Sequence, residues 1–425
     1  NGYFNLGYSF DDRYLMDFSL RENGSSVFGA SKRYIGTWSV GLGWNLHKER
    51  FIADHLTWID FLKLRASIGN PGNQNFSSSK TLTTFNFQLA SMNYFGMGAV
   101  LNQLGNPDLD WQITLDKNIG IDMILIDKRL NITADYYHKV TDPLLINISM
   151  PLSSGTSSYL TNMGKQISQG LTLSASYYII QKLDQRFSWL VRGNLRTQKT
   201  KLDKIGNKLD ELNKSGQGHN TVRYYNGADP DDIWAVKSAG INPSTGRELF
   251  YDKEGNYTYD FSYDNEVICG NTRPKIEGVI GTSLNYKGFS VSMNFRYQTG
   301  ASVFNEALFN KVENISVSGL NKNQDKRALY ERWQNPGDKV RFKDIANAAS
   351  TPMSSRFIQK ENVLSMESVY VGYEFYEGWI KKIGLSNLKI QASMRDVFRA
   401  STIKSERGTL YPFARSLELG LSFNF

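Results

Sequence analysis

The residues best suited to bind a ligand lie in one long polar segment, residues 203–273. Among its many Asn, Asp and Gly residues stand the aromatic side chains of Tyr224, Tyr225, Trp234 and Tyr257. An exposed aromatic ring offers apolar stacking area at small entropic cost, and Asn and Asp add directional hydrogen bonds. Such a surface suits sugars and peptides. The same rings are equally suited to pack the segment against itself or a partner protein, because a large ordered loop needs its own core.

Covalent catalysis and metal binding have little support in the sequence. The four histidines show no pairing at a metal-ligand spacing such as H-x-x-x-H; they are His47, His55, His138 and His219. We find no G-x-S-x-G elbow, P-loop or EF-hand pattern, and the single Cys269 excludes an internal disulfide. Residues 229–232 form a small acidic cluster that is more simply solvated, although Asp231 remains a binding candidate. We therefore predict no enzyme activity and no cofactor.

Strict alternation of polar and apolar residues predicts the elements that would position these side chains. In residues 415–425 the apolar positions are Leu417, Leu419, Leu421, Phe423 and Phe425. A period of two indicates a strand with one apolar face, and about ten residues suit a tilted crossing of a bilayer. The pattern recurs at residues 13–21, 38–46, 130–136, 171–179, 187–195, 289–298, 369–375 and 388–394. With less regular segments, we predict about thirteen strands.

The connections between these strands alternate between short and long. Short connections are predicted at residues 11–12, 126–128, 181–185 and 287–288. Long ones are predicted at residues 71–110, 203–273 and 300–362. Soluble sandwiches mix loop lengths at both ends, whereas outer-membrane barrels place short turns on the periplasmic side and long loops outside. We therefore predict an all-β fold, the C-terminal portion of a transmembrane antiparallel β-barrel, whose odd strand number needs partner strands for closure.

Alternation also predicts which side chains face the interior of such a barrel. The predicted inward residues are Arg196, Arg296, Gln298, Gln391 and Arg395. Polar residues line a wide lumen whatever the function, so lining or plug contact is the default interpretation. We keep Arg296 and Arg395 as candidates for substrate binding. The predicted outward aromatics, which would contact lipid or its interfaces, are Trp38, Trp44, Trp189 and Tyr297.

The composition restricts the partners. The formal net charge is +8, but Lys and Arg are scattered rather than collected on a helix, so we predict no nucleic-acid binding. Basic rims would instead contact anionic lipid headgroups or acidic solutes. No apolar run approaches the roughly 18 residues of a spanning helix, which excludes a helical membrane protein.

Several motifs occur in a fixed order along the chain. They are LRASIGNPGN at residues 64–73, NPDLDWQ at 106–112, NIGID at 118–122, DYY at 135–137, KSAGINP at 237–243, GNTRPK at 270–275, YKGF at 286–289, and RW at 332–333 before PGD at 336–338. In order and spacing they resemble the SusC/RagA-type outer-membrane transporters, the large TonB-dependent receptors of Bacteroidetes. The resemblance covers essentially all of residues 1–425.

The resemblance implies a fold and a function. The family barrel has about twenty-two strands around an N-terminal plug, so residues 1–425 would be its C-terminal part, without the plug and about nine strands. It further implies active import of glycans or oligopeptides across the outer membrane. The implied partners are a SusD-like surface lipoprotein, the missing N-terminal plug and barrel segment, TonB-ExbB-ExbD acting through the plug, and outer-membrane lipid. The aromatic loop slightly favours glycans.

Three alternatives remain open. A passive porin assembled from several chains would conduct ions without a plug. A barrel-type outer-membrane hydrolase would need a catalytic Ser, Asp or Glu beside His138 or His219. A soluble β-rich adhesin or carbohydrate-binding protein would purify without detergent.

Overall fold

The structure is a computed structural model. It describes residues 1–25, 32–73, 81–150, 152–156, 158–182, 184–315, 319, 321–344, 346–347, 349–375, 378–404 and 415–425. The chain divides into two compact units. The first comprises Asn1–Gln181, Trp189–Lys214 and Tyr224–Asp229, and the second Lys182–Ser188, Ser215–Arg223 and Pro230–Phe425.

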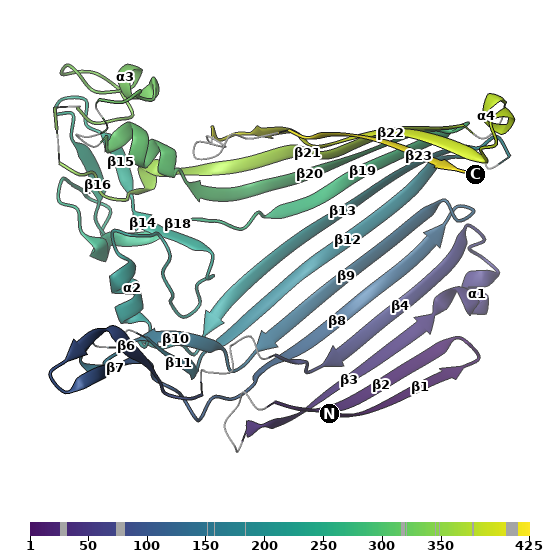
Figure 1. The fold of residues 1–425 in the computed structure, drawn as a ribbon, viewed down its shortest axis with the longest axis horizontal. Helices are drawn as coiled ribbons and strands as arrows, with labels where there is room; N and C mark the ends of the chain where they lie inside the picture. Colours follow the sequence, from purple (N-terminus) through teal and green to yellow (C-terminus); the bar gives the residue numbers. More distant parts are fainter. Residues whose placement is uncertain are drawn as a thin grey trace. The chain divides into compact units, whose positions relative to one another are not determined.

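The first unit is dominated by eight long strands (Figure 1). In sheet order they are β1 (Gly2–Phe10), β2 (Tyr14–Gly24), β3 (Tyr34–Asn45), β4 (Ile59–Gly69), β8 (Gln112–Leu125), β9 (Leu130–Thr141), β12 (Lys165–Lys182) and β13 (Phe187–Asp203). Neighbouring strands from β1 to β12 pair antiparallel. The order is that of a meander, because consecutive long strands are neighbours.

Five further long strands form the sheet of the second unit. They are β19 (Ile276–Tyr286), β20 (Phe289–Phe304), β21 (Ile358–Phe375), β22 (Asn387–Ser401) and β23 (Leu417–Asn424), all paired antiparallel. In the pairing of β20 with β21, Asn294 lies opposite Ser368 and Phe295 opposite Met366, which leaves Glu367 as the extra residue of a bulge. Eight and five long strands in the described residues give the predicted thirteen.

One face of these strands is apolar although it is exposed. Leu417, Leu419 and Leu421 of β23 are 66%, 78% and 63% exposed. In water this surface would favour aggregation, but it is the surface that a strand in contact with lipid requires. Among the described residues, no helix is long and apolar enough to span a membrane.

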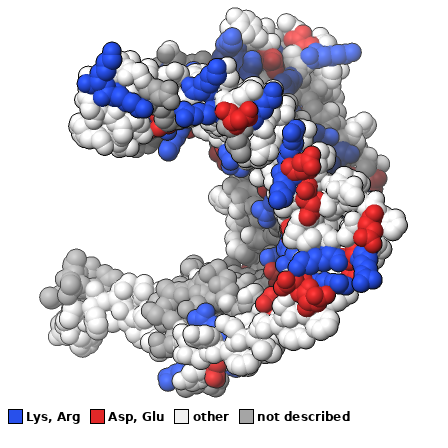
Figure 2. Space-filling model, turned by 90° about the vertical axis from the view of Figure 1, so that its right-hand side faces the viewer, with Lys and Arg blue, Asp and Glu red and all other residues white. Residues whose placement is uncertain are grey.

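Short connections join the strands at one end. Between β19 and β20 the turn is only Lys287 and Gly288, with φ of 44° and 91°. A two-residue hairpin with both φ values positive matches the twist of the strands, and glycine adopts this conformation without strain. Acidic and basic side chains intermingle over this end (Figure 2). In the first unit two ion pairs lie at the short connections, Arg13–Asp11 at 3.0 Å and Lys48–Asp12 at 3.1 Å. The alternation of short and long connections is confirmed.

The long connections carry small sheets and helical turns. The strands are β5 (Gly72–Asn73), β6 (Thr84–Asn93), β7 (Gly96–Gln103), β10 (Leu145–Ser149), β11 (Ser158–Asn162), β14 (Asp232–Val236), β15 (Ser238–Ile241), β16 (Glu248–Tyr251), β17 (Tyr257–Thr258) and β18 (Glu266–Asn271). The helical segments of the long connections are η3 (Leu152–Ser154), α2 (Asp210–Gly216), η4 (Tyr263–Asn265), the π-helical η5 (Leu308–Glu313), α3 (Arg327–Tyr330) and η7 (Ser355–Phe357). The shorter connections carry η2 (Leu46–Lys48), α1 (Arg50–Ala53) and α4 (Trp379–Lys382).

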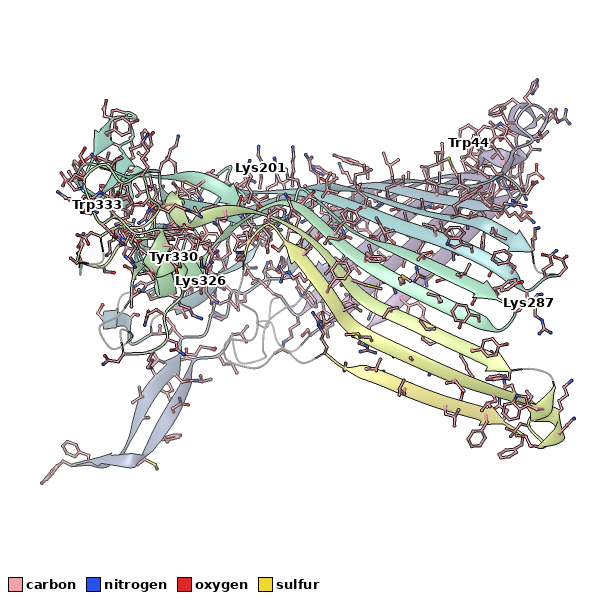
Figure 3. All side chains as sticks on the ribbon, turned by 90° about the horizontal axis from the view of Figure 1, so that it is seen from above. Trp44, Lys201, Lys287, Lys326, Tyr330 and Trp333 are labelled. Carbon is pink, nitrogen blue, oxygen red and sulfur yellow. The ribbon has the colours of Figure 1, made fainter. Side chains whose placement is uncertain are left out.

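The buried apolar clusters lie at these long connections. One consists of Leu144, Leu202, Ile205 and Leu209 in the first unit. The other, in the second unit, consists of Leu308, Val312, Ala328, Phe342 and Phe357. Figure 3 shows Tyr330 and Trp333 of this second region at the opposite end of the strands from Lys287. The long connections therefore fold around buried cores; the second cluster lies within one connection, and the first joins residues of two.

Candidate functional site

The seven predicted binding residues fall into separate groups. Tyr224 packs against the cluster of Leu202 and its neighbours. Its backbone N–H donates to Oδ1 of Asn213 at 2.8 Å, and its carbonyl accepts from Nδ2 of Asn213 at 2.9 Å. These contacts support the packing interpretation for Tyr224. Tyr225 is exposed, and nothing in its surroundings distinguishes packing from ligand binding.

Trp234 belongs to the two-stranded sheet of β14 and β18, and Asp231 directly precedes β14. Asp231 forms an ion pair with Arg273, and its carbonyl accepts a hydrogen bond from the N–H of Thr272 at 2.9 Å. Trp234 lies opposite Ile268 in the strand register. The contacts of Asp231 join the two ends of the segment from 231 to 273, so this part of the acidic cluster has a structural role. Within the part of the chain that the structure describes, no three His, Cys, Asp or Glu side chains form a metal site.

A buried ion pair holds the same sheet and was not predicted. The guanidinium of Arg223, only 1% exposed, donates two hydrogen bonds to Glu266, Nε to Oε2 at 2.8 Å and Nη2 to Oε1 at 2.7 Å. Burial raises the pKa of Glu266, and Arg223 opposes this shift. No local sequence pattern marks the pair, because its members are 43 residues apart. Two parallel charge-assisted hydrogen bonds fix both the distance and the angle of the partners.

A second buried network anchors β16. Arg356 donates from Nη2 to Oε2 of Glu248 at 2.8 Å and to Oε1 of Glu313 at 2.6 Å. Ser354 donates to Oε1 of Glu248 at 2.6 Å, and Thr351 donates to Oε1 of Glu313 at 2.9 Å. Burial alone would lower the pKa of Arg356, but the hydrogen bonds that it donates to the two carboxylates, together with their negative charges, outweigh burial and raise it. Arg356 therefore fastens two long connections of the second unit to each other.

Tyr257 is the most exposed of the predicted loop residues, at 67%. It lies in β17, directly opposite Tyr251 of β16 in the strand register. A hydrogen bond with Tyr251 raises the pKa of Tyr257. Sequence inspection missed Tyr251 as its ring partner, since only the pairing of β16 with β17 brings the two together.

Arg296 and Arg395 occupy polar positions of β20 and β22. Arg296 forms an ion pair with Glu367, the bulge residue of β21. Arg395 is exposed and lies opposite Ser368 of β21. Nearby polar positions also bond across strands, as in Asn294 Nδ2 to Ser368 Oγ at 3.0 Å. The two arginines thus belong to a hydrogen-bonded polar strand face.

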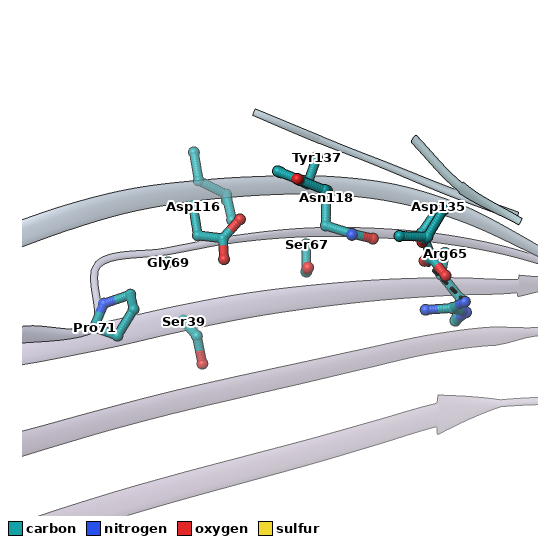
Figure 4. A pocket seen from close by; sticks show the side chains of 11 residues that line it. Ser39, Arg65, Ser67, Gly69, Pro71, Asp116, Asn118, Asp135 and Tyr137 are labelled. Atoms are coloured by element: carbon teal, nitrogen blue, oxygen red, sulfur yellow. Dashed lines mark hydrogen bonds and ion pairs between the residues drawn. The ribbon is translucent and has the colours of Figure 1, made fainter. Parts of the chain in front are cut away.

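The first unit carries a denser polar site on its strands, around Arg65 of β4 (Figure 4). Arg65 donates from Nε to Oδ2 of Asp122 at 2.6 Å and from Nη2 to Oδ1 of Asp135 at 3.1 Å. Asp122 also accepts from the hydroxyl of Thr133 at 3.1 Å. The three charged residues come from β4, β8 and β9, so one arginine bridges three neighbouring strands. Arg65, Asp122 and Asp135 each stand at a polar position of a strand in which polar and apolar residues alternate. This alternation is the sequence signal from which these residues could have been predicted.

Glycines create the room for this site. Gly120 lies between Arg65 and Asp135 in the strand register, and a Cβ there would collide with the carboxylate of Asp135. A cavity of about 540 Å³ opens beside the ion cluster. Its polar lining includes Ser67, Asn118 and Tyr137, and Figure 4 shows Asn118 and Ser67 between Arg65 and Asp116. The arrangement suits hydrogen bonding to a hydrated polar solute or polypeptide.

Comparison with known proteins places this geometry in a family. The model of the family described as TonB dependent receptor-like, beta-barrel, matches residues 1–321. The chain belongs to this TonB-dependent receptor family. In each unit the polar strand face therefore belongs to a barrel interior, with Arg65 in the first unit and Arg296 in the second. The apolar face with Leu419 contacts lipid, and the protein resides in the outer membrane.

Individual receptors agree with this membership. TonB-dependent receptor P39 of Formosa agariphila is 27% identical over 98% of this chain and 44% of its own length. TonB-dependent receptor SusC of Bacteroides thetaiotaomicron is 26% identical over 99% of this chain and 43% of its own length. The predicted resemblance to SusC/RagA-type receptors is confirmed. The chain spans less than half the length of these receptors.

A solved receptor structure has the same fold. The RagAB peptide transporter superposes with a TM-score of 0.81 at 22% sequence identity, covering 95% of this chain and 44% of that one. At this identity the likeness concerns the fold of the receptor barrel. The expected antiparallel β-barrel fold with long connections is thereby confirmed.

Proposed function

We propose that this receptor chain forms part of the wall and the extracellular loops of an active importer for glycans or oligopeptides. The observation that carries the proposal is the combination of a family barrel with a polar, charge-lined strand face around Arg65. Such a face supports passage of a hydrated solute, while the folded loops offer exposed aromatic rings for its first capture. The solved transporter named above is described as a peptide transporter, and SusC is named as a receptor only.

The proposal includes partners. A surface lipoprotein of the SusD type would cover the extracellular loops, and TonB-ExbB-ExbD would act through a plug supplied by the N-terminal segment. Ligand binding would shift the plug between closed and open arrangements, which requires that the ligand prefer one of them. The chain would supply binding and guidance rather than covalent chemistry.

Uptake and copurification test the proposal together. The receptor is extracted from outer membranes in mild detergent, and every copurifying polypeptide is identified by mass spectrometry. Plug-bearing sequence and a lipoprotein in fixed ratio, with loss of glycan or peptide uptake after gene deletion, are the expected results. Uptake that persists unchanged in the deletion strain and when the proton gradient is collapsed would contradict active import.

Conductance separates the importer from the passive porin. In planar bilayers the complete receptor should be nearly closed, because the plug fills the lumen. A large steady conductance of the plug-containing protein would favour the porin instead.

A further inference from the structure

The small sheet β15–β16–β17 presents an aromatic face. The rings of Tyr251 and Tyr257 lie with centroids 5.1 Å apart at an interplanar angle of 39°, and their hydroxyls are 3.5 Å apart. Tyr259 follows β17 and accepts a hydrogen bond from Nδ2 of Asn242 at 2.7 Å. Tyr257 and Tyr259 are exposed, and Tyr251 is half-buried. Three ordered tyrosine rings therefore lie at the surface of one small sheet and its adjoining turns.

Two cations lie over these rings. Nζ of Lys237 is 5.1 Å from the ring centroid of Tyr251, and the guanidinium carbon of Arg247 is 4.7 Å from that of Tyr259. Both cationic side chains are exposed. Attraction between a cation and an aromatic face holds the charge in place without using its N–H groups. We call Tyr251, Tyr257, Tyr259, Lys237 and Arg247 the tyrosine platform.

The other side of β16 is anchored inside the loop. Glu248 and Phe250 alternate with Leu249 and Tyr251 along the strand. Glu248 is held by Arg356 at 2.8 Å, and the ring of Phe250, 4% exposed, packs edge-on against Phe261 at 5.3 Å. The platform therefore rests on a rigid support, which is what a binding surface needs to avoid an ordering cost.

Charge indicates which ligand this surface suits. We propose that the tyrosine platform binds oligosaccharides that carry carboxylate or sulfate groups. The proposal rests on the proposed import function, of which it names the substrate class. Tyrosine rings supply apolar area for the C–H faces of sugar rings, and Lys237 and Arg247 supply charge-assisted hydrogen bonds to the anionic substituents.

Three acidic residues directly follow platform residues in the sequence: Glu248, Asp252 and Asp260. Glu248 is paired with Arg356 inside the loop. Asp252 is held in its own turn, where its Oδ1 accepts the backbone N–H of Asn256 at 2.8 Å and its Oδ2 accepts from Nδ2 of the same residue at 3.2 Å. Its carboxylate is thus occupied by its own turn. These hydrogen bonds lower the pKa of Asp252, so it stays ionised and bound there.

The experiment measures binding to the complete receptor in detergent with three probes. They are a hexamer of galacturonic acid, the same hexamer with its carboxyl groups methyl-esterified, and hexaglutamate. Isothermal titration calorimetry gives each affinity at low and high salt. We expect the acidic sugar to bind at least tenfold more tightly than the other two, and its advantage to shrink at high salt because exposed charges are screened.

Matched variants locate the binding. Replacing both Lys237→Gln and Arg247→Gln should remove the advantage of the acidic sugar over its ester, and Tyr257→Ala should weaken both sugars about fivefold. The control combines Lys326→Gln with Tyr330→Ala, an exposed lysine and tyrosine in another long connection (Figure 3). The control should change none of the affinities.

The outcomes separate this inference from the function on which it rests. Equal binding of the acid and its ester, tighter binding of hexaglutamate, or no effect of the platform variants would overturn the platform assignment. If nutrient uptake still depends on the receptor in those cases, the import function stands without it. Retained acidic-sugar binding in a receptor whose deletion leaves all uptake intact would instead overturn the import function.

Discussion

The ion cluster around Arg65 depends on a single missing side chain. Gly120 sits where a methyl group would press on Asp135 and on the guanidinium of Arg65. Gly120→Ala should therefore lower the stability of the folded barrel by about 1–3 kcal/mol, as overpacking does elsewhere. The temperature at which the folded band is lost in electrophoresis measures this.

Gly36→Ala is the matched control for that prediction. It is the same substitution in another strand of the first unit, and no atom lies within 4 Å of the added Cβ. Its effect should be negligible. Equal effects at positions 36 and 120 would show that strand propensity, rather than the ion cluster, sets the cost.

Arg356 carries a second prediction at the same scale. Arg356→Met leaves Glu313, whose side chain is fully buried, without its cation. Removing one partner of a buried pair costs about 3–5 kcal/mol. Hydrogen exchange should accelerate in residues 304–315 and 248–251, which the arginine connects.

Arg341→Met provides the comparison for Arg356→Met. Arg341 pairs with Glu331 at 3.6 Å and both side chains are well exposed, so the loss should stay within about 1 kcal/mol. If hydrogen exchange in residues 304–315 and 248–251 is equally fast in the two variants, the buried network does not hold the loops together.

The thiol of Cys269 should be inert. Burial raises its pKa, and a weaker opposing effect comes from its hydrogen bond to the carbonyl of Ala235 at 3.5 Å. Because the thiolate is the reactive form, labelling at neutral pH should be slower than for an exposed cysteine introduced by Asn256→Cys, and should rise with pH. Labelling of Cys269 as fast as position 256 would contradict its burial.

At the level of elements, the hairpin β6–β7 should have low stability, because it forms a separate two-stranded sheet. Residues 81–105 contain no charged side chain, and Tyr94 and Phe95 at its tip are 97% and 93% exposed. An isolated two-stranded hairpin is at best marginally stable in water. Chymotrypsin should therefore cut the purified receptor at this tip among its first sites.

The double variant Tyr94→Ser, Phe95→Ser tests that cleavage. It should abolish the early fragment while leaving the later cleavage pattern unchanged. Persistence of the same fragment, located by mass spectrometry, would mean that another segment opens first.

Long strands could be predicted from the sequence because a period of two over eight or more residues leaves little choice. β20 and β23 are examples. The strands of β15–β17 could not, since they have two to four residues each and their pairing depends on a bulge near Gly240. For the same reason Tyr257 was predicted as a candidate while Tyr251, Lys237 and Arg247 were not. Arg65 was overlooked because strand register is not encoded in any one segment.

At the level of the whole molecule, the two ends of the strands should differ in access from outside the cell. In a Cys269→Ser background, Asn256→Cys in a long connection should react on intact cells with a polymer-linked maleimide too large for porins. Gln185→Cys, in the short connection between β12 and β13, should react only after the outer membrane is opened. Reaction of both on intact cells would contradict the predicted topology.

The separate cores of the long connections have a consequence for how such receptors diversify. The residues on the apolar face of the strands are constrained by contact with lipid. The support of the tyrosine platform is constrained by the contacts of Glu248 and Phe250 with their partners in the connections. Selection can thus act on one without disturbing the other. In a receptor lineage the residues of the long connections can therefore be exchanged as a group while the strand residues that contact lipid stay the same.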